Sequence, residues 1–300
     1  MMKRQALSLY IAHCTLKIAK VCGIIGGGGV LSMSKKKIGF IGAGNMATAI
    51  INGLLKNDPQ NAERLCVFDL DSAKCALMAE KNISVADSCP ALAKQCGIIV
   101  LAVKPQNYPE VLADIKDSVS DDTVIVTIAA GISIDKVRRG LDRNCPVVRV
   151  MPNTPLLLGK GASALCRSEN ITDEDFDEVR KMFALSGEAV LLPESQMNAV
   201  IAVNGSSPAY VYLFAKAMVD YAVSVGIDRD TALALVCKTF EGSAEMLRKS
   251  GDSPEVLIQK VSSKGGTTIE ALKVLNERAV PQAIIDAMAA CTRRAEELGK

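Results

Sequence analysis

Histidine is almost absent from this sequence: its 300 residues contain one, His13, near the N-terminus. A histidine-based triad, a histidine-ligated zinc ion and a histidine general base are therefore nearly excluded. Tryptophan is missing and the chain has only 5 Tyr and 6 Phe, so few side chains could stack on single-stranded nucleic acid. An excess of charge is lacking as well, because 35 Lys and Arg residues face 33 Asp and Glu residues, so no strong field attracts nucleic acid or an anionic membrane.

Cysteine, in contrast, is common, with 10 residues, but no two of them have the C-x-x-C spacing of a metal or redox motif. Most of them, from Cys66 to Cys291, lie within apolar runs. Such cysteines are typical of small buried side chains in a reducing compartment. The sequence therefore predicts a cytoplasmic protein without disulfides and without a bound metal.

The first 33 residues differ from the rest of the chain. They contain four basic residues and no acidic one, and the Gly-rich stretch from Val21 to Ser34 is shorter than the run of about 20 apolar residues that a membrane helix needs. We interpret residues 1–33 as an extension that is disordered or not native to the protein. A targeting sequence is the alternative interpretation. The length of the chain, 300 residues, predicts two domains, or one domain with a large appendage.

A glycine turn follows directly after the first apolar run of the predicted fold. Ile38–Ile41 has the pattern of a strand, Gly42–Ala47 reads G-x-G-x-x-A, and the residues from Thr48 onward are apolar at helical spacing. A strand, a tight glycine turn and a helix together form the phosphate site of dinucleotide-binding domains, with the pyrophosphate at the helix N-terminus. The predicted cofactor-binding residues in this turn are Ile41, Gly42, Ala43, Gly44, Asn45 and Met46.

Further apolar runs alternate with helical segments, as in a doubly wound parallel sheet. We expect strands at Leu65–Phe68, Gly97–Val103, Val124–Ile128 and Val147–Val150. Cofactors bind at the carboxyl ends of such strands. The residues expected beside the nicotinamide are therefore Ala102, Val103, Lys104, Pro105, Ala129, Ala130 and Gly131.

Asp69 ends the second predicted strand, about 27 residues after Gly42. An acidic group there can accept a hydrogen bond from the ribose 2′-hydroxyl and would repel a 2′-phosphate. No arginine follows within the next several residues. The chemistry therefore favours NADH over NADPH weakly, and both remain candidate cofactors.

Strand patterns end at about Pro193, and the rest of the chain is predicted to be helical. Pro208 and Gly226 mark the start and the end of one long helix, and Asp228 precedes another that continues to about Lys249. The second helix is apolar on several faces, which favours burial in a subunit interface. The predicted fold class is α/β: a Rossmann-type dinucleotide-binding domain over residues 34–192, followed by an all-helical substrate and dimerisation domain over residues 193–300.

Several motifs, in their order along the chain, resemble those of the pyrroline-5-carboxylate reductases. They are Gly39–Met46, Ala102–Gln106, Ile128–Gly131, Met151–Pro155, Gly205–Tyr210 and Ser263–Thr268. The first motif alone would fit many families, whereas the last two are specific. The resemblance covers residues 36–299. It implies an oxidoreductase that reduces 1-pyrroline-5-carboxylate to L-proline with NADPH or NADH, in the last step of proline biosynthesis, and that forms a homodimer or a larger homo-oligomer such as a decamer.

The resemblance also implies site residues in the helical half. Thr268 is the predicted catalytic residue, with its hydroxyl hydrogen-bonded to the ring nitrogen of the substrate. The implied substrate-binding residues are Ser263, Gly265, Gly266, Thr267, Thr268, Gly205 and Ser206, and the implied contact of Asn153 is with the cofactor. The Gly265–Thr268 segment begins a helix, so its free N–H groups can hold a carboxylate. Lys264 departs from the family pattern, in which a proline is usual, and it loosens the turn.

Two other functions fit part of the sequence. A β-hydroxyacid dehydrogenase shares the glycine turn and a helical second domain, but it needs a catalytic lysine on the interdomain helix, where Lys216 is the only lysine and has different surroundings. A non-catalytic dinucleotide-binding sensor would keep the glycine turn but has no need of a polar loop such as Ser263–Thr268. Reduction of a cyclic imine, in contrast, needs no histidine, because catalysis is mostly positioning once the ring nitrogen is protonated. The expected partners are a small molecule and further copies of the chain, and neither nucleic acid nor membrane.

Overall fold

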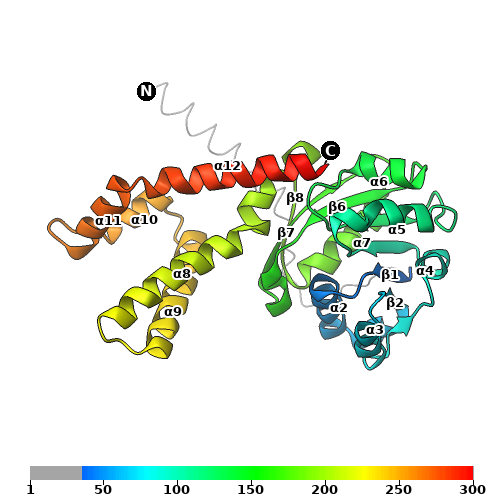
Figure 1. Ribbon diagram of the computed structural model, residues 1–300, viewed down its shortest axis with the longest axis horizontal. Coiled ribbons are helices and arrows are strands. Elements are labelled where there is room, and N and C mark those ends of the chain that lie inside the picture. The colour runs from blue at the N-terminus through cyan, green and yellow to red at the C-terminus, as the bar shows by residue number, and fades with distance from the viewer. Residues whose placement is uncertain (1–35, 300) are drawn as a thin grey trace, which may run out of the picture. The chain divides into compact units, whose positions relative to one another are not determined.

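The computed structural model describes residues 36–299, and the predicted extension over residues 1–33 lies outside them (Figure 1). An eight-stranded sheet dominates the first half of the described residues, with the strand order β3-β2-β1-β4-β5-β6-β7-β8. The strands are β1 (Ile38–Ile41), β2 (Leu65–Phe68), β3 (Ser84–Val85), β4 (Ile98–Leu101), β5 (Val124–Thr127), β6 (Val147–Met151), β7 (Gly161–Arg167) and β8 (Gly187–Leu191). The order reverses between β1 and β4, as in a doubly wound sheet.

The strands that the apolar runs predict are all present and run parallel. β1 pairs with β2 and with β4, and β5 pairs with β4 and with β6. Every residue of β1, β4 and β5 is buried, as expected of parallel strands that have no solvated face. Three further strands were not predicted: β7, β8 and the two-residue strand β3. Strand β7 runs antiparallel to β6, and β8 pairs with β7.

Helices of the first half follow the strands. They are α2 (Asn45–Asn57), α3 (Ser72–Ala79), α4 (Cys89–Gln95), α5 (Tyr108–Ile115), α6 (Ile134–Leu141) and α7 (Asp173–Ala184). Side chains of Asp71, Ser88, Ser133 and Thr172 accept N–H groups of the helices that they precede, which is the usual way to begin a helix. Helix α2 lacks such a cap. Helix α5 lacks one too, but it continues directly from the helical turn Pro105–Asn107, whereas α2 begins at a glycine.

The second half of the described residues contains helices and no strand. Its main helices are α8 (Ser207–Ser224), α9 (Arg229–Lys249), α10 (Pro254–Lys260), α11 (Thr267–Glu277) and α12 (Val280–Gly299). Asp228 caps α9 by accepting the N–H groups of Asp230 and Thr231, and Ser253 caps α10. The predicted fold class, a Rossmann-type half followed by a helical half, is confirmed. The predicted boundary between residues 192 and 193 falls between β8 and the first helical turn, Glu194–Gln196.

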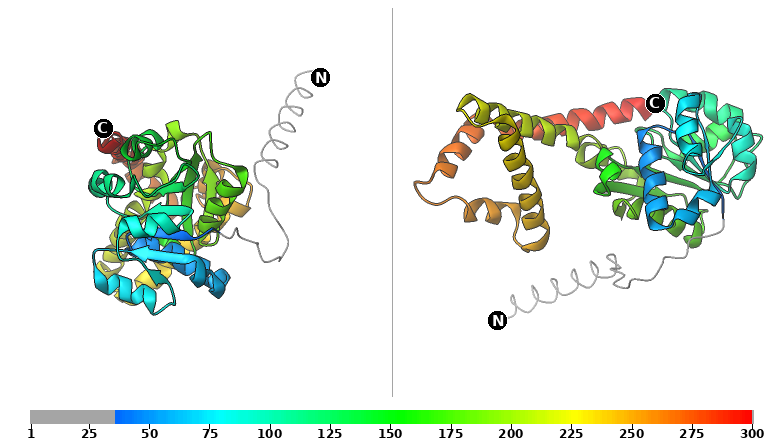
Figure 2. Two further views of the ribbon diagram at one scale, coloured as in Figure 1. Left: turned by 90° about the vertical axis from the view of Figure 1, so that its right-hand side faces the viewer. Right: turned by 90° about the horizontal axis from the view of Figure 1, so that it is seen from below.

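The two halves differ in how much apolar surface they bury. The main core belongs to the sheet and its helices and includes Leu92, Leu101 and Ile125. The core of α8 and α9 is small and centres on Val219, Ala232 and Val236. Large apolar side chains of α8 and α9 remain exposed, such as Leu213 at 67%, Tyr221 at 70% and Leu235 at 61%. Figure 2 shows that α9, α10 and α11, in yellow to orange, lie away from the strands.

A buried arginine connects the sheet to the start of the helical half. Arg149 on β6 donates to the side chain of Asn198 and lies 3.8 Å from the carboxylate of Glu194. Glu194 also accepts the N–H group of Ile134 at the start of α6. These bonds fix the segment that leads from β8 to α8 against the sheet.

Candidate active site

The glycine turn between β1 and α2 has a backbone that only glycine suits. Gly42 has a φ of +99°, and a Cβ there would lie 2.7 Å from the carbonyl oxygen of Ala102. The N–H group of Gly42 donates to the Phe68 carbonyl at the end of β2. The turn is therefore held against the ends of both neighbouring strands, β2 and β4.

Gly44 has a different role, because the chain itself does not require a glycine there. Its φ is −74°, and a Cβ built on it would meet nothing within 4 Å. Gly44 is the N-cap of α2 and offers no side chain, so the first N–H groups of the helix, at Asn45, Met46 and Ala47, keep their donors free. An open approach, free donors and a positive helix end are what a pyrophosphate needs. The residues present therefore fit a dinucleotide cofactor.

Asp69 joins the end of β2 to the glycine turn. One carboxylate oxygen accepts the N–H group of Ala43 at 2.8 Å, and the other accepts that of Asp71 at 2.9 Å. Burial by itself would raise the pKa of Asp69, but these two donors and the Lys74 ammonium, 3.6 Å away, bring that pKa below its ordinary value. Asp69 is thus ionised and supports the turn. Its predicted contact with the ribose stays a prediction.

The segments predicted to lie beside the nicotinamide follow two neighbouring strands. Ala102–Pro105 comes directly after β4, and Ala129–Gly131 comes just after β5, which pairs with β4. Ala129 and Gly131 are buried, whereas the Lys104 side chain is exposed. The structure thus brings both segments to the carboxyl edge of the sheet, where the glycine turn also lies.

Tyr108 supports this edge and was missed by the sequence analysis. Its buried hydroxyl bonds to the Leu101 carbonyl at 2.9 Å and to the Thr127 hydroxyl at 2.8 Å, so it ties the end of β4 to the end of β5. Burial raises the pKa of Tyr108, which keeps the hydroxyl protonated. The sole signal in the sequence is an aromatic residue placed shortly after the Pro105 turn.

Asn153, a predicted cofactor residue, uses its amide on the backbone of the protein. Its side-chain nitrogen donates to the carbonyl of Asn204, and its oxygen accepts the N–H group of Ala162. The Asn204 amide in turn donates to the carbonyls of Met151 and Ala162, at 2.7 and 2.8 Å. The two asparagines therefore fix the segment before α8, which contains Gly205 and Ser206, to the ends of β6 and β7.

The predicted substrate loop, Ser263–Thr268, is a tight turn followed by a helix. Gly265 has a φ of +75°, and the N–H group of Gly266 donates to the Ser263 carbonyl at 2.9 Å, as in a type II turn. Gly266 is the N-cap of α11 and provides no side-chain cap. Thr267 and Thr268 are the first two residues of the helix, so their N–H groups are among its free donors.

The substrate loop and the cofactor segments do not meet within one copy of the chain. Among residues 36–299, no backbone hydrogen bond joins Ser263–Thr268 to the glycine turn or to the ends of β4 and β5. Helix α11 packs against α12, and Figure 1 shows it away from the strands. Gly205 and Ser206, the other predicted substrate residues, lie at the start of α8, close to Met151 at the end of β6.

Metal sites and membrane spans were searched over the same residues. In residues 36–299 no group of three or more His, Cys, Asp or Glu side chains is placed to hold a metal ion. None of the helices in this part of the chain has both the length and the apolar character to cross a membrane.

Comparison with known proteins agrees with this geometry. Residues 194–298 match the family model described as pyrroline-5-carboxylate reductase dimerisation, and residues 37–131 match the model described as NADP oxidoreductase coenzyme F420-dependent. The chain is 38% identical over 267 residues to the pyrroline-5-carboxylate reductase of Escherichia coli (strain K12), which covers 89% of this chain and 99% of that protein. This chain belongs to the pyrroline-5-carboxylate reductase family.

Solved structures of the pyrroline-5-carboxylate reductase family share the fold over most of the chain. The reductase of Plasmodium falciparum, solved with NADP bound, superposes with a TM-score of 0.82 at 30% identity and covers 90% of this chain and 100% of that one. The reductase of Coxiella burnetii superposes with a TM-score of 0.81 at 31% identity, covering 89% of this chain and 100% of that one. The family that the motifs indicated is confirmed.

Proposed function

We propose that this chain reduces 1-pyrroline-5-carboxylate to L-proline with NADPH or NADH, the last step of proline biosynthesis. The observation that carries this function is the pairing, in one chain of this family, of two helices with open, glycine-formed N-termini. One of them suits a pyrophosphate and the other a carboxylate. The reaction needs both, because its cofactor is a dinucleotide and its substrate is an anionic cyclic imine.

The first half holds the cofactor. The N–H groups of Asn45, Met46 and Ala47 would bind the pyrophosphate, and Asp69 would face the ribose. The Ala102–Pro105 and Ala129–Gly131 segments would lie against the nicotinamide, and Tyr108 keeps the two strands that carry them together. The reduced nicotinamide supplies a hydride to the imine carbon. NADPH or NADH serves in this role, and the preference between them is tested below.

The second half holds the substrate. The N–H groups of Thr267 and Thr268 and the Ser263 hydroxyl would bind the carboxylate, and the Thr268 hydroxyl would bind the ring nitrogen. Since the ring nitrogen carries a proton when the imine binds, the residues need to position the imine carbon rather than donate a strong acid. This assignment is supported by the free helix terminus, since the N-cap residue Gly266 has no side chain to occupy the first N–H groups of α11.

A complete site requires a second copy of the chain. The chain self-associates through its helical half, which matches the dimerisation model of the family. We propose a homodimer, which can assemble further into a ring such as a decamer, in which the substrate loop of one copy faces the cofactor segments of the other. The apolar side chains exposed on α8 and α9, such as Leu213 and Tyr221, would be buried between the copies.

The setting that we propose is the cytoplasm, without nucleic acid or membrane partners. Eight cysteines among the described residues are free thiols, which suits a reducing compartment. The near-neutral charge of the chain offers no field for nucleic acid.

A dehydrogenase acting on β-hydroxyacids fits the structure less well. Lys216, the lysine that such an enzyme would need on the interdomain helix, is 73% exposed on α8 and pairs with Asp220 at 2.6 Å. Its ammonium is therefore directed to solvent and to its own helix.

The test is an assay of NAD(P)H oxidation by the purified chain with 1-pyrroline-5-carboxylate, followed by identification of the product. We expect oxidation that depends on the imine and yields one L-proline per cofactor. Turnover of a β-hydroxyacid instead would support the dehydrogenase, and cofactor binding without turnover of either substrate would support a sensor. Either of these results contradicts the proposal.

A further inference from the structure

Helix α12 touches the segment predicted to lie beside the nicotinamide. Gly131 has a φ of +77°, and a Cβ there would lie 2.8 Å from the Ala295 carbonyl oxygen and 3.0 Å from the Gly299 nitrogen. The backbone of the last turn of α12 therefore lies directly against the backbone of the Ala129–Gly131 loop. No other residue at position 131 would allow this approach.

A lysine of the sheet half fixes the end of α12 at this place. Lys136 on α6 directs its ammonium to the carbonyl oxygens of Leu298 and Gly299, both at 3.4 Å. These are among the carbonyls that a helix leaves without an internal partner at its C-terminus, where the negative end of the helix dipole favours a cation. Lys136 thus holds α12 against the loop that its own helix follows.

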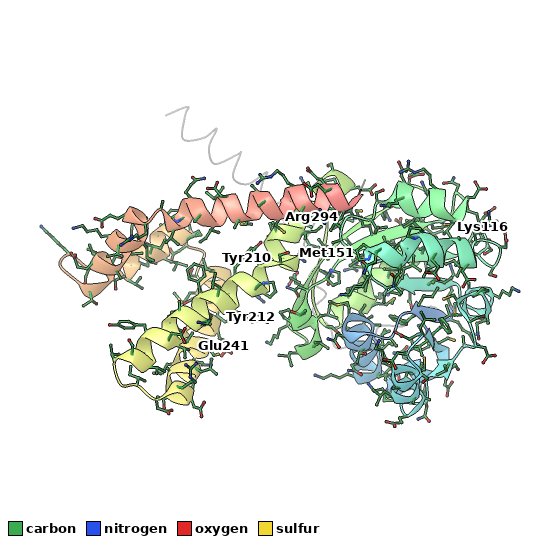
Figure 3. All side chains as sticks on the ribbon, in the orientation of Figure 1. Lys116, Met151, Tyr210, Tyr212, Glu241 and Arg294 are labelled. Atoms are coloured by element: carbon green, nitrogen blue, oxygen red, sulfur yellow. The ribbon has the colours of Figure 1, made fainter. Side chains whose placement is uncertain are left out.

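About one turn before its contact with Gly131, helix α12 also contacts Ser206, a predicted substrate-binding residue. The Cys291 thiol donates to the Ser206 hydroxyl at 3.2 Å, and Ser206 is the N-cap of α8, with a side chain that caps none of that helix's N–H groups. Tyr210, one turn along α8, faces the same thiol: burial and then the hydrogen bond with Cys291 raise the pKa of Tyr210. Figure 3 shows Tyr210 on α8 and Arg294 on the neighbouring stretch of α12.

The spacing of these contacts suits a reaction between two bound molecules. Cys291 and Ala295 are four residues apart, about one helical turn, or roughly 6 Å along the axis. One rigid turn therefore separates the contact with Ser206 from the contact with the Ala129–Gly131 loop. Hydride transfer needs its donor and acceptor atoms held about 3–3.5 Å apart, so a fixed spacing between the two sides of the site matters for the rate.

We propose that α12 positions the reductase site, with Cys291 as the positioning residue for Ser206 and Lys136 as the positioning residue for the Ala129–Gly131 loop. This proposal rests on the proposed function, because Ser206 and the loop matter for the reaction only if they contact substrate and cofactor. We assign Cys291 and Lys136 no contact of their own with substrate or cofactor, since their side chains bond to Ser206 and to the end of α12.

A double-mutant cycle tests the role of Cys291. We expect Cys291→Ala to lower kcat/KM for 1-pyrroline-5-carboxylate by about 3- to 10-fold, the scale of one hydrogen bond, and Cys291→Ser to restore most of it. In a Ser206→Ala background the same change should have a much smaller effect, because the thiol then keeps only the Tyr210 hydroxyl as a polar neighbour. Equal losses in both backgrounds, or no loss in the first, would overturn the proposal. Thr292→Ala, at the next residue of α12, whose hydroxyl bonds to the Met288 carbonyl of the same helix, is the matched control.

A second pair of variants tests the cofactor side. Lys136→Met should raise KM for NAD(P)H about 2- to 5-fold and leave KM for the imine unchanged. The effect is small because a cation at a helix C-terminus contributes only a modest free energy. Arg139→Met is the control, since Arg139 lies on the same helix and donates only to the carbonyl of Asp135. Equal effects of both variants, or no effect of Lys136→Met, would overturn this part. Wild-type protein that does not oxidise NAD(P)H with the imine would instead contradict the proposed function itself.

Discussion

The two glycine turns that begin α2 and α11 have similar backbones but different support. Each contains a glycine with positive φ, +99° at Gly42 and +75° at Gly265. Each ends in a glycine N-cap without a side-chain cap, Gly44 and Gly266. The first turn, however, is packed against Ala102, whereas a Cβ at Gly265 would meet nothing within 4 Å.

This difference separates a turn that is complete in one chain from one that is not. Strands β2 and β4 and the Asp69 carboxylate hold the cofactor turn. The substrate turn is held by its local bond from Gly266 to Ser263. We infer that the surroundings of the substrate turn come from a second copy, so changes at the dimer surface should affect the two turns unequally.

The largest effect is expected from breaking the dimer. Leu213→Asp places a charge on the exposed apolar surface of α8 and should give monomers with a kcat/KM at least about 100-fold lower, since the substrate loop loses its position. NAD(P)H binding should persist, because the cofactor turn needs one chain. Light scattering measures the oligomeric state, and titration with NAD(P)H measures cofactor binding. Leu77→Asp, at an exposed leucine of α3, should change neither property. Fully active monomers would contradict the inference that the substrate turn needs a second copy of the chain.

The next effect concerns the hydroxyl of the substrate turn. Thr268→Ala should lower kcat/KM for the imine by roughly 10- to 100-fold, the loss of one hydrogen bond to a charged group, with NAD(P)H affinity nearly unchanged. The melting temperature should change little, because the N-cap of α11 is Gly266 and not Thr268. Thr267→Ala is the control in the same turn and should have a small effect. Equal, small effects of both variants would mean that the turn is structural.

The charge beside the cofactor turn should set the choice between NADH and NADPH. Asp69→Ser should shift the ratio of the two kcat/KM values towards NADPH by about 1–2 kcal/mol, the scale of one repulsion near a surface. Asp69→Asn is the matched variant, since it removes the charge and keeps the size. Because the carboxylate also holds Ala43, both variants should lose some stability. If the ratio stays constant in both, Asp69 does not face the ribose.

The smallest effect is expected from stiffening the substrate turn. Lys264 occupies the second position of the turn, where proline suits the backbone of a type II turn. Lys264→Pro should raise the free energy of unfolding by about 0.4–1 kcal/mol, through fewer conformations of the unfolded chain. Urea unfolding measures this free energy, and Lys264→Ala shows how much of the change comes from the loss of the lysine charge alone. A loss of stability would show that the backbone at 264 does not suit proline.

The sequence predicted those parts of the molecule that depend on local chemistry. The cofactor turn follows from the G-x-G-x-x-A spacing between a buried strand and a helix, and α9 begins where Asp228 can accept two N–H groups. The chain reversal at Ser263–Thr268 likewise follows from two consecutive glycines. Residues close in sequence determine each of these features.

The parts that the sequence did not predict depend on contacts between distant segments. Strand β7 contains mostly small residues and pairs antiparallel to β6, and β8 extends the sheet with Val190 and Leu191 half-exposed at the edge, so neither has a clear alternation. The Asn153 amide is bound to residues 162 and 204, and no local pattern shows this. The approach of Ala295 to Gly131 spans more than half of the chain.

The most direct test of the central claim, a site shared between two copies, is complementation between two defective chains. Gly44→Val should block the pyrophosphate in one chain, and Thr268→Ala weakens the substrate loop in the other. Co-expressed, the two should recover about a quarter of the wild-type rate, because half of randomly formed dimers are mixed and each mixed dimer has one intact site. A rate no higher than the mean of the two parent proteins would contradict the account, since it would place both turns of each site in the same chain.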